Sequence, residues 1–177
     1  PVKIALFIVL GLVALVVVVA LLFYVAGVQM PREHRSVVTA TFKASRDAVW
    51  TAITDYAAMP SWWPAVKSVR SESLPDGIEL TWNTDSHGQE IPFRTGELRV
   101  NQKLVRVIAK DNLPFGGTWT YVLADAPGGG TQLTIIEDGY INPAIFRAVA
   151  KWFIGLDPTQ KDFIANLEKH LATKASP

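Results

Sequence analysis

An uncharged run of twenty-five residues, 4–28, constrains this chain more than any other feature. Almost every side chain in the run is Leu, Val, Ile, Ala or Phe. As a helix rising about 1.5 Å per residue it would be roughly 37 Å long, enough to cross a hydrocarbon core of about 30 Å with some tilt. The sequence therefore predicts a transmembrane anchor, residues 1–30, followed by one domain, residues 31–177.

A cleavable signal peptide is the alternative reading of this run. The apolar part of such a peptide is usually about 7 to 15 residues long and ends in small residues. Here the run is longer, its exit at residues 23–31 has no clean small-x-small pair, and Tyr24 stands where an interfacial aromatic anchors a span. These features favour a retained single-pass anchor.

The charges that flank the run bear on its orientation. Lys3 alone marks the short side, whereas Arg32, Arg35, Lys43 and Arg46 follow within about 20 residues of the other end. This count leans towards a cytoplasmic domain. Long domains can cross a membrane regardless of such charges, so the side of the membrane stays open.

The composition of the remaining chain excludes several classes of protein. Its length suits one compact domain. Apart from Lys3 it has sixteen Lys and Arg against sixteen Asp and Glu, which is not the footprint of a nucleic-acid-binding protein. The absence of cysteine excludes a disulfide framework, a thiolate metal site and a Cys nucleophile. No metal-ligand spacing, phosphate loop or Gly-x-Ser-x-Gly motif occurs, so no metal or cofactor is expected.

Hydrophobic periodicity predicts an α+β domain. A Val- and Thr-rich strand at residues 36–42 precedes a helix with Ser45 as its N-cap and a short helical turn at residues 56–59. From residue 66 to residue 140 the period is two, which predicts an antiparallel meander of six strands. These strands are expected at residues 66–74, 77–83, 90–100, 104–109, 118–124 and 131–140.

The C-terminal part is predicted to be a long, interrupted helix. Asn142-Pro143 opens it, and a second start signal at Asp157-Pro158 interrupts it. Its first half is expected to share one apolar face, made of Ile145, Phe146, Val149, Trp152 and Phe153. A curved meander that packs around such a helix leaves a cup between the sheet and the helix.

The order of elements, with residues 45–50 starting the first helix and a Trp62-Trp63 corner, resembles the START-like superfamily, also called SRPBCC. Residues 115–121, 137–139 and 142–147 are similar to membrane-anchored bacterial members of its polyketide cyclase/dehydrase-like branch. The resemblance covers about residues 34–172. It implies a helix-grip fold with a deep apolar cavity that holds lipids, sterols, polyketides or similar molecules. Some members are enzymes and many are binding or transfer modules, so the resemblance narrows the ligand class and not the reaction.

Five charged residues should border the cup: Arg94, Glu97, Glu137, Asp138 and Arg147. All of them except Glu97 are candidate catalytic groups. Glu137 points inward if it shares the face of the apolar inner residues of its strand. A buried carboxylate would pair with an Arg, or would have a raised pKa and act as an acid or base. The alternative is that Glu137 and Asp138 bond to the backbone or to Arg147 and fix the start of the C-terminal helix.

The three histidines give little indication of a site. His34, His87 and His170 fall in the juxtamembrane segment, a turn and the last helix, and nothing in the sequence shows that they converge.

Aromatic side chains are the main candidates for binding a ligand, because flat rings with a few polar tips can orient an apolar molecule. Core packing is the alternative, and one side chain can serve both roles in a cup-shaped fold. With Glu97, the candidate ligand-binding residues are Trp62, Trp63, Trp82, Phe93, Trp119, Tyr121, Tyr140, Phe146 and Trp152.

Three hypotheses about function follow. The first is a membrane-anchored module that binds a hydrophobic small molecule or lipid without covalent catalysis. The second is a cyclase or dehydratase that uses Glu137 or Asp138 as general base, with Arg94 or Arg147 stabilising an enolate. The third is a module that docks a protein partner at the membrane, which an exposed apolar patch outside the cup would favour.

Overall fold

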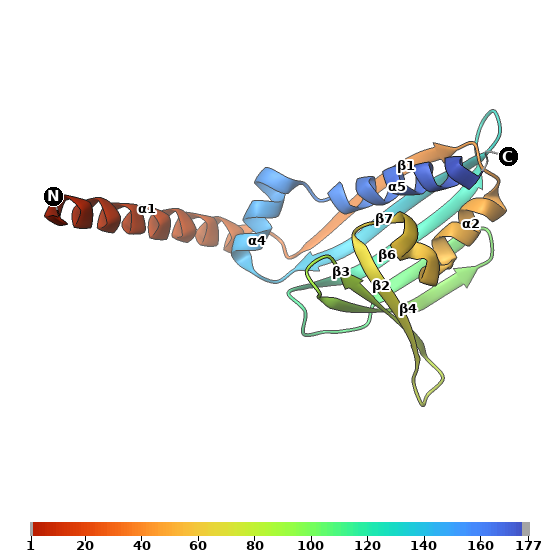
Figure 1. The fold of residues 1–177 in the computed structure, drawn as a ribbon, viewed down its shortest axis with the longest axis horizontal. Coiled ribbons are helices and arrows are strands. Elements are labelled where there is room, and N and C mark those ends of the chain that lie inside the picture. The colour runs from red at the N-terminus through yellow and green to blue at the C-terminus, as the bar shows by residue number, and fades with distance from the viewer. Residues whose placement is uncertain (1, 175–177) are drawn as a thin grey trace.

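The structure is a computed structural model that describes residues 2–174 (Figure 1). Helix α1, Val2–Gln29, projects away from the rest of the chain and is long and apolar enough to cross a membrane. Only Met30, Pro31 and Arg32 separate it from strand β1, Glu33–Phe42, which begins before the predicted residue 36. The connection between α1 and the sheet is therefore shorter than expected.

A seven-stranded antiparallel sheet forms the body of the domain, in the order β1-β7-β6-β5-β4-β3-β2. It confirms the predicted α+β meander, which β1 extends by pairing with β7. The remaining strands are β2 (Val66–Ser73), β3 (Glu79–Asp85), β4 (Glu90–Arg99), β5 (Lys103–Ile108), β6 (Phe115–Asp125) and β7 (Thr131–Ile141).

The register of the central strands decides which side chains face inward. Trp119 of β6 lies opposite Glu137 of β7 and Arg106 of β5, and Tyr121 lies opposite Ile135. Because side chains alternate between faces along a strand, these five residues share one face of the sheet. Glu137 therefore points inward, as the sequence pattern suggested.

Helices cover this inner face. Helix α2, Arg46–Thr54, starts at Ser45, whose hydroxyl accepts a hydrogen bond from the Ala48 backbone N–H at 3.2 Å, as predicted for an N-cap. The 3₁₀ turn η1 (Tyr56–Ala58) and the short helix α3 (Met59–Trp62) follow. Helix α5, Pro158–Lys174, lies across the sheet and begins at the predicted proline.

The ring of Phe163 lies at the centre of the core. This α5 residue is completely buried, and four rings surround it, with centroids 4.9 to 6.0 Å away. The four are Trp62, Trp63, Trp119 and Tyr121. Such edge and tilted contacts stabilise beyond the area they bury. They hold α5 against the sheet.

The segment before α5 departs from the prediction. Helix α4, Ala144–Val149, continues as a π-helical turn η2, Ala150–Ile154, and the chain then reverses at Gly155, whose φ of 88° suits a residue without a Cβ. The predicted apolar face does not pack on the core. Four of its five members are exposed, namely Ile145, Phe146, Trp152 and Phe153, because α4 and η2 lie beside α1 instead of over the sheet.

The C-terminal end of α1 is fixed to α4. Gly27 approaches Ala144 so closely that a Cβ atom on it would overlap the Ala144 carbonyl oxygen. The buried Arg147 donates from Nε to the Gly27 carbonyl oxygen at 2.9 Å. One turn earlier, the Phe23 ring meets those of Trp152 and Phe153. Helix α1 and the rest of the chain are therefore joined by packing as well as by the chain itself.

We expect Phe163→Ala to lower the free energy of unfolding by about 3 to 5 kcal/mol, because it leaves a cavity among four rings. The measurement is urea unfolding of the full chain in detergent, followed by tryptophan fluorescence. Phe153→Ala is the matched control, since Phe153 is exposed and its loss should cost only about 1 kcal/mol, the value of one aromatic pair. Equal losses in the two variants would contradict the central role of Phe163.

Candidate functional site

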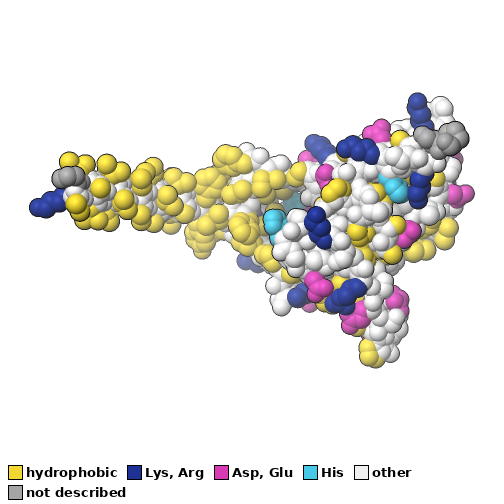
Figure 2. Space-filling view, viewed as in Figure 1, with side chains coloured by type: hydrophobic (Ala, Val, Ile, Leu, Met, Phe, Trp, Pro, Cys, Tyr) yellow, Lys and Arg dark blue, Asp and Glu magenta, His cyan; other side chains and the backbone are white. Residues whose placement is uncertain are grey.

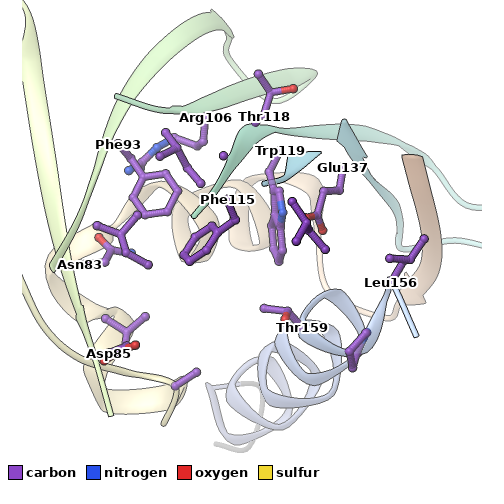
Figure 3. Close-up of a pocket in the computed structure, with 18 of the residues that line it drawn as sticks. Asn83, Asp85, Phe93, Arg106, Phe115, Thr118, Trp119, Glu137, Leu156 and Thr159 are labelled. Atoms are coloured by element: carbon purple, nitrogen blue, oxygen red, sulfur yellow. The ribbon is translucent and has the colours of Figure 1, made fainter. Parts of the chain in front are cut away.

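A cavity of about 660 Å³ lies between the inner face of the sheet, η1, and the segment that joins α4 to α5 (Figure 3). Its volume lies within the range of about 300 to 1,000 Å³ that is typical of small-molecule sites. The walls are mainly apolar, and Ile53, Ile91, Ile108 and Phe115 are among their members. The cavity lies where the sequence predicts the cup between the sheet and the C-terminal helix, and its role in holding a ligand stays a prediction.

Five of the predicted ligand-binding residues line this cavity: Trp63, Phe93, Trp119, Tyr121 and Phe146. Trp63, Trp119 and Tyr121 also contact Phe163, so each has one side on the core and another on the cavity. Burial raises the pKa of the Tyr121 hydroxyl, which stays neutral. That these residues bind a ligand stays a prediction.

The structure places three other predicted aromatics outside the cavity. Trp62 is buried in the core against Phe163 and the His170 ring. Trp82 lies on the opposite face of the sheet, where it donates to Glu72 at 2.6 Å. Tyr140 also faces away, since it follows the inward Glu137 by three residues.

Glu97 and Trp152 are likewise away from the cavity. Glu97 forms ion pairs with Lys103 and Arg99 at the end of β4, at 2.6 and 2.9 Å, and these partners lower its pKa. Trp152 is half exposed beside α1, with its ring 5.5 Å from that of Phe23. Their positions correct the prediction that they line the cup.

Of the four candidate catalytic groups, only Glu137 reaches the cavity. Asp138 is exposed and pairs with Arg35 at 3.0 Å, and Arg94 is exposed on the face opposite Phe93. Arg147 has no carboxylate partner among residues 2–174, so the alternative that Glu137 or Asp138 pairs with it does not hold. It donates instead to the carbonyl oxygens of Gly27, Ile141 and Asn142.

Glu137 has a histidine partner that the sequence analysis missed. His34 Nε2 lies 3.5 Å from Glu137 Oε1, and the Trp119 side chain also hydrogen-bonds to this carboxyl. Burial nevertheless raises the pKa of Glu137, because desolvation outweighs these contacts. His34 belongs to β1 and not to a juxtamembrane linker, and extending the alternation of β1 by two residues would have placed it on the inner face.

Arg106 is the second polar group that was missed. It comes from β5, is buried, and donates from Nη2 to the Thr81 hydroxyl. Its guanidinium lies over the rings of Tyr56 and Phe93, 3.8 and 5.2 Å from their centroids. The pattern Leu104-Val105-Arg106-Val107-Ile108 could have revealed it, because the period of two places this Arg between two inward apolar residues.

The geometry supports an apolar chamber with an acid–histidine pair on one wall and a guanidinium on another. No group of three or more His, Cys, Asp or Glu residues suited to a metal ion occurs within residues 2–174. The arrangement can enclose an amphiphilic molecule, and Glu137 can exchange a proton with such a molecule.

Residues 33–172 match the family model described as polyketide cyclase / dehydrase and lipid transport. The chain belongs to this family. The match spans most of the chain from β1 to α5, and it agrees with the resemblance drawn from the sequence motifs. No curated protein sequence matches the chain.

Solved structures of the START superfamily share this fold. The di-domain ARO/CYC BexL from the BE-7585A biosynthetic pathway matches 86% of this chain, with a TM-score of 0.66 and 14% identity. It also matches the Zhui aromatase/cyclase from Streptomyces sp. R1128, with a TM-score of 0.64, 11% identity, and 81% and 96% of the two chains covered. A START superfamily protein from Mycobacterium smegmatis matches with a TM-score of 0.59 and 16% identity, and the match covers 80% of this chain and 99% of that protein. At such identities these likenesses show the fold alone.

The chain spans about half the length of the di-domain proteins that it matches, 53% of BexL and 52% of the ARO/CYC StfQ from the steffimycin pathway. It corresponds to one of their domains in fold.

The raised pKa of Glu137 predicts a pH-dependent stability. A carboxyl that binds its proton more tightly in the folded state stabilises the fold below its ordinary pKa, 4.5, and loses this contribution as the pH rises through the raised value. The free energy of unfolding of Glu137→Gln minus that of wild type should therefore be more favourable to the variant at pH 7 than at pH 4. Urea unfolding at both pH values measures this difference.

Asp138→Asn is the matched control for that experiment. Its carboxylate is exposed and paired with Arg35, an interaction worth about 0 to 1 kcal/mol. The free energy of unfolding of Asp138→Asn minus that of wild type should not rise between pH 4 and pH 7. A Glu137→Gln profile that runs parallel to the Asp138→Asn profile would contradict the assigned environment of Glu137.

Proposed function

We propose that this protein is a membrane-anchored module that binds, and can transfer, a hydrophobic small molecule or lipid. Residues 1–30 form the anchor and residues 31–177 the binding domain. The observation that carries this proposal is the cavity of about 660 Å³ with mainly apolar walls, whose rim next to the anchor is itself apolar. The family, which includes polyketide cyclases, dehydrases and lipid transport proteins, supports a ligand of this class.

The rim residues support entry of the ligand from a bilayer. Phe146, Ile154 and Leu156 line the cavity and are also 58%, 61% and 37% exposed. The neighbouring Trp152 and Phe153 pack on Phe23 of the anchor. Figure 2 shows this apolar surface as a continuation of the yellow column of α1. An exposed apolar patch marks a contact with a membrane or a protein.

Continuity with the anchor favours the membrane as that contact. Trp and other aromatic side chains at the end of a span suit the level of the lipid headgroups. The contacts of Gly27 and Arg147 with α4 and α1 would keep the rim at this level. A molecule dissolved in the bilayer would then meet the cavity at a high effective concentration. A protein-docking role would require a patch separate from this rim.

Blocking the cavity tests the proposal. Val149→Trp puts a large ring on a cavity-lining position of α4, whereas Ile145→Trp puts the same ring on an exposed position of the same helix that does not line it. The full chain, purified in detergent with membrane lipid extract, is analysed by native mass spectrometry. Wild type and Ile145→Trp should retain an apolar ligand. The amount bound to Val149→Trp should be lower by at least about tenfold, since the new ring fills the space of the ligand.

Lipids that adhere to α1 do not confuse the result, because the two variants share the same anchor. If wild type carries no ligand beyond those that Val149→Trp also carries, the binding proposal is wrong.

A second candidate function, that of a cyclase or dehydratase, is favoured by one observation: a carboxyl of raised pKa, with a histidine beside it, faces the cavity. Such a group could remove a proton from the carbon next to a substrate carbonyl, and His34 could donate a proton to the carbonyl oxygen. Glu137 stays the candidate base for this role, whereas Asp138, Arg94 and Arg147 lie elsewhere. The cation on the cavity wall is Arg106.

Turnover of a linear poly-β-carbonyl surrogate, followed by mass spectrometry for loss of water, tests the enzymatic function. Glu137→Gln and His34→Ala should each lower the rate about 10²- to 10⁴-fold, the usual contribution of a general acid or base. Asp138→Asn should leave the rate unchanged. Loss of water at equal rates with wild type and Glu137→Gln would exclude this function for the site.

A further inference from the structure

We propose that Arg106 forms a subsite for the anionic head group of the ligand, so that the cavity takes a single-chain amphiphile with a carboxylate or phosphate head. This inference rests on the proposed binding function and specifies its ligand class. The head would lie against β5, and the chain would extend towards η2 and the anchor.

The first argument is that the charge of Arg106 is not balanced. The residue exposes only 6% of its surface, and no carboxylate lies within ion-pair distance of it among residues 2–174. A guanidinium cannot escape this cost by losing its proton, because Arg side chains stay protonated in proteins. Burial of a charge without a counter-ion is strongly unfavourable, and buried charges in proteins are normally paired.

The groups around Arg106 compensate only in part. The Thr81 hydroxyl accepts one of the five N–H donors, and the ring of Tyr56, 3.8 Å away, interacts with the face of the guanidinium. Both groups are neutral. The Nε atom is buried and has no hydrogen-bond partner in the described chain. Donor capacity and net charge are therefore left over.

The two carboxyl groups of residues 2–174 that line the cavity, those of Asp85 and Glu137, already have other partners. Asp85 Oδ1 accepts the backbone N–H groups of His87 and Gln89 at 2.8 and 2.9 Å, which lower the pKa of Asp85 and hold it in its turn. Glu137 lies beside His34. Neither forms an ion pair with Arg106, so the missing counter-charge is left for a ligand to supply.

The layout of the cavity suits an amphiphile. In Figure 3, Arg106 and Phe93 lie on one side of the pocket, and Leu156 lies on the opposite side. Leu156 and Ile154 belong to the exposed apolar rim, so the route from Arg106 to the rim runs past apolar walls. An Arg fork matches the planar carboxylate and the phosphate group equally well in chemistry, and the experiment distinguishes them.

The test is photolabelling of the full chain in nanodiscs of neutral lipid, at a pH where both acidic heads are ionised. Three probes share one eighteen-carbon chain with a mid-chain diazirine and differ in the head: a carboxylate, a phosphate monoester and a methyl ester. Peptide mass spectrometry gives the ratio of label on β5, β6 and β7 to label on α1. Label on α1 reports the probe in the bilayer and corrects for partitioning.

We expect this ratio to be about tenfold higher for at least one anionic probe than for the ester, the effect of a hydrogen bond to a charged group. Arg106→Met should lower the anionic ratio to that of the ester and leave the ester ratio unchanged. Arg94→Met is the matched control, because Arg94 is an exposed Arg on the opposite face of the neighbouring strand β4, and it should change nothing.

Each outcome decides a separate point. Preference for only one anionic probe identifies the head group. Equal ratios for the ester and both acids overturn the Arg106 subsite and leave the binding function standing. Absence of label on the strands with every probe overturns the binding function itself. Should Arg106→Met fail to fold by circular dichroism, the acid-to-ester ratio of wild type decides alone.

Discussion

The packing of one helix residue, Phe163, determines where this domain is solid and where it is hollow. Its ring fills the space between α5 and the sheet, and Trp63, Trp119 and Tyr121 close around it. Large rings cannot be compressed, so they hold α5 at a fixed distance from the sheet. Towards the beginning of α5, where no such ring fills the gap, the same separation leaves the cavity. Core and cavity are thus two consequences of one contact.

The polar groups of the cavity acquire their properties from this hollow. Glu137 and Arg106 come from neighbouring regions of one sheet, yet their partners differ. Glu137 lies beside His34 and has a raised pKa, whereas the charge of Arg106 meets a hydroxyl and aromatic rings and, within residues 2–174, no carboxylate at ion-pair distance. An apolar surrounding makes both charges costly. A bound amphiphile or a reacting carbonyl compound would relieve that cost, and this connects the two proposed functions physically.

The junction between α1 and α4 gives the cavity its proposed orientation to a membrane. Arg147 is buried there without a carboxylate partner among the described residues, and it uses its donors on three carbonyl oxygens, one of them near the end of α1. Free carbonyls at a helix C-terminus carry partial negative charge, so a cation is stabilising at this place. The residue first considered for catalysis instead joins the end of α1 to α4, beside the rim of the cavity.

Sequence patterns alone predicted the apolar helix and the antiparallel meander, because these depend on local period and composition. They gave an inward Glu137 only on the condition that it shares the face of the apolar inner residues of its strand, which the register of β6 and β7 meets. The family resemblance added the helix-grip fold. Trp82, Tyr140, Glu97 and Trp152 were predicted to line the cup and lie outside it, since aromatic or charged character does not reveal which face of a sheet or helix a residue occupies. The approach of His34 to Glu137 joins residues more than one hundred positions apart. Only the tertiary structure decided such contacts, because strand register and helix packing bring distant residues together.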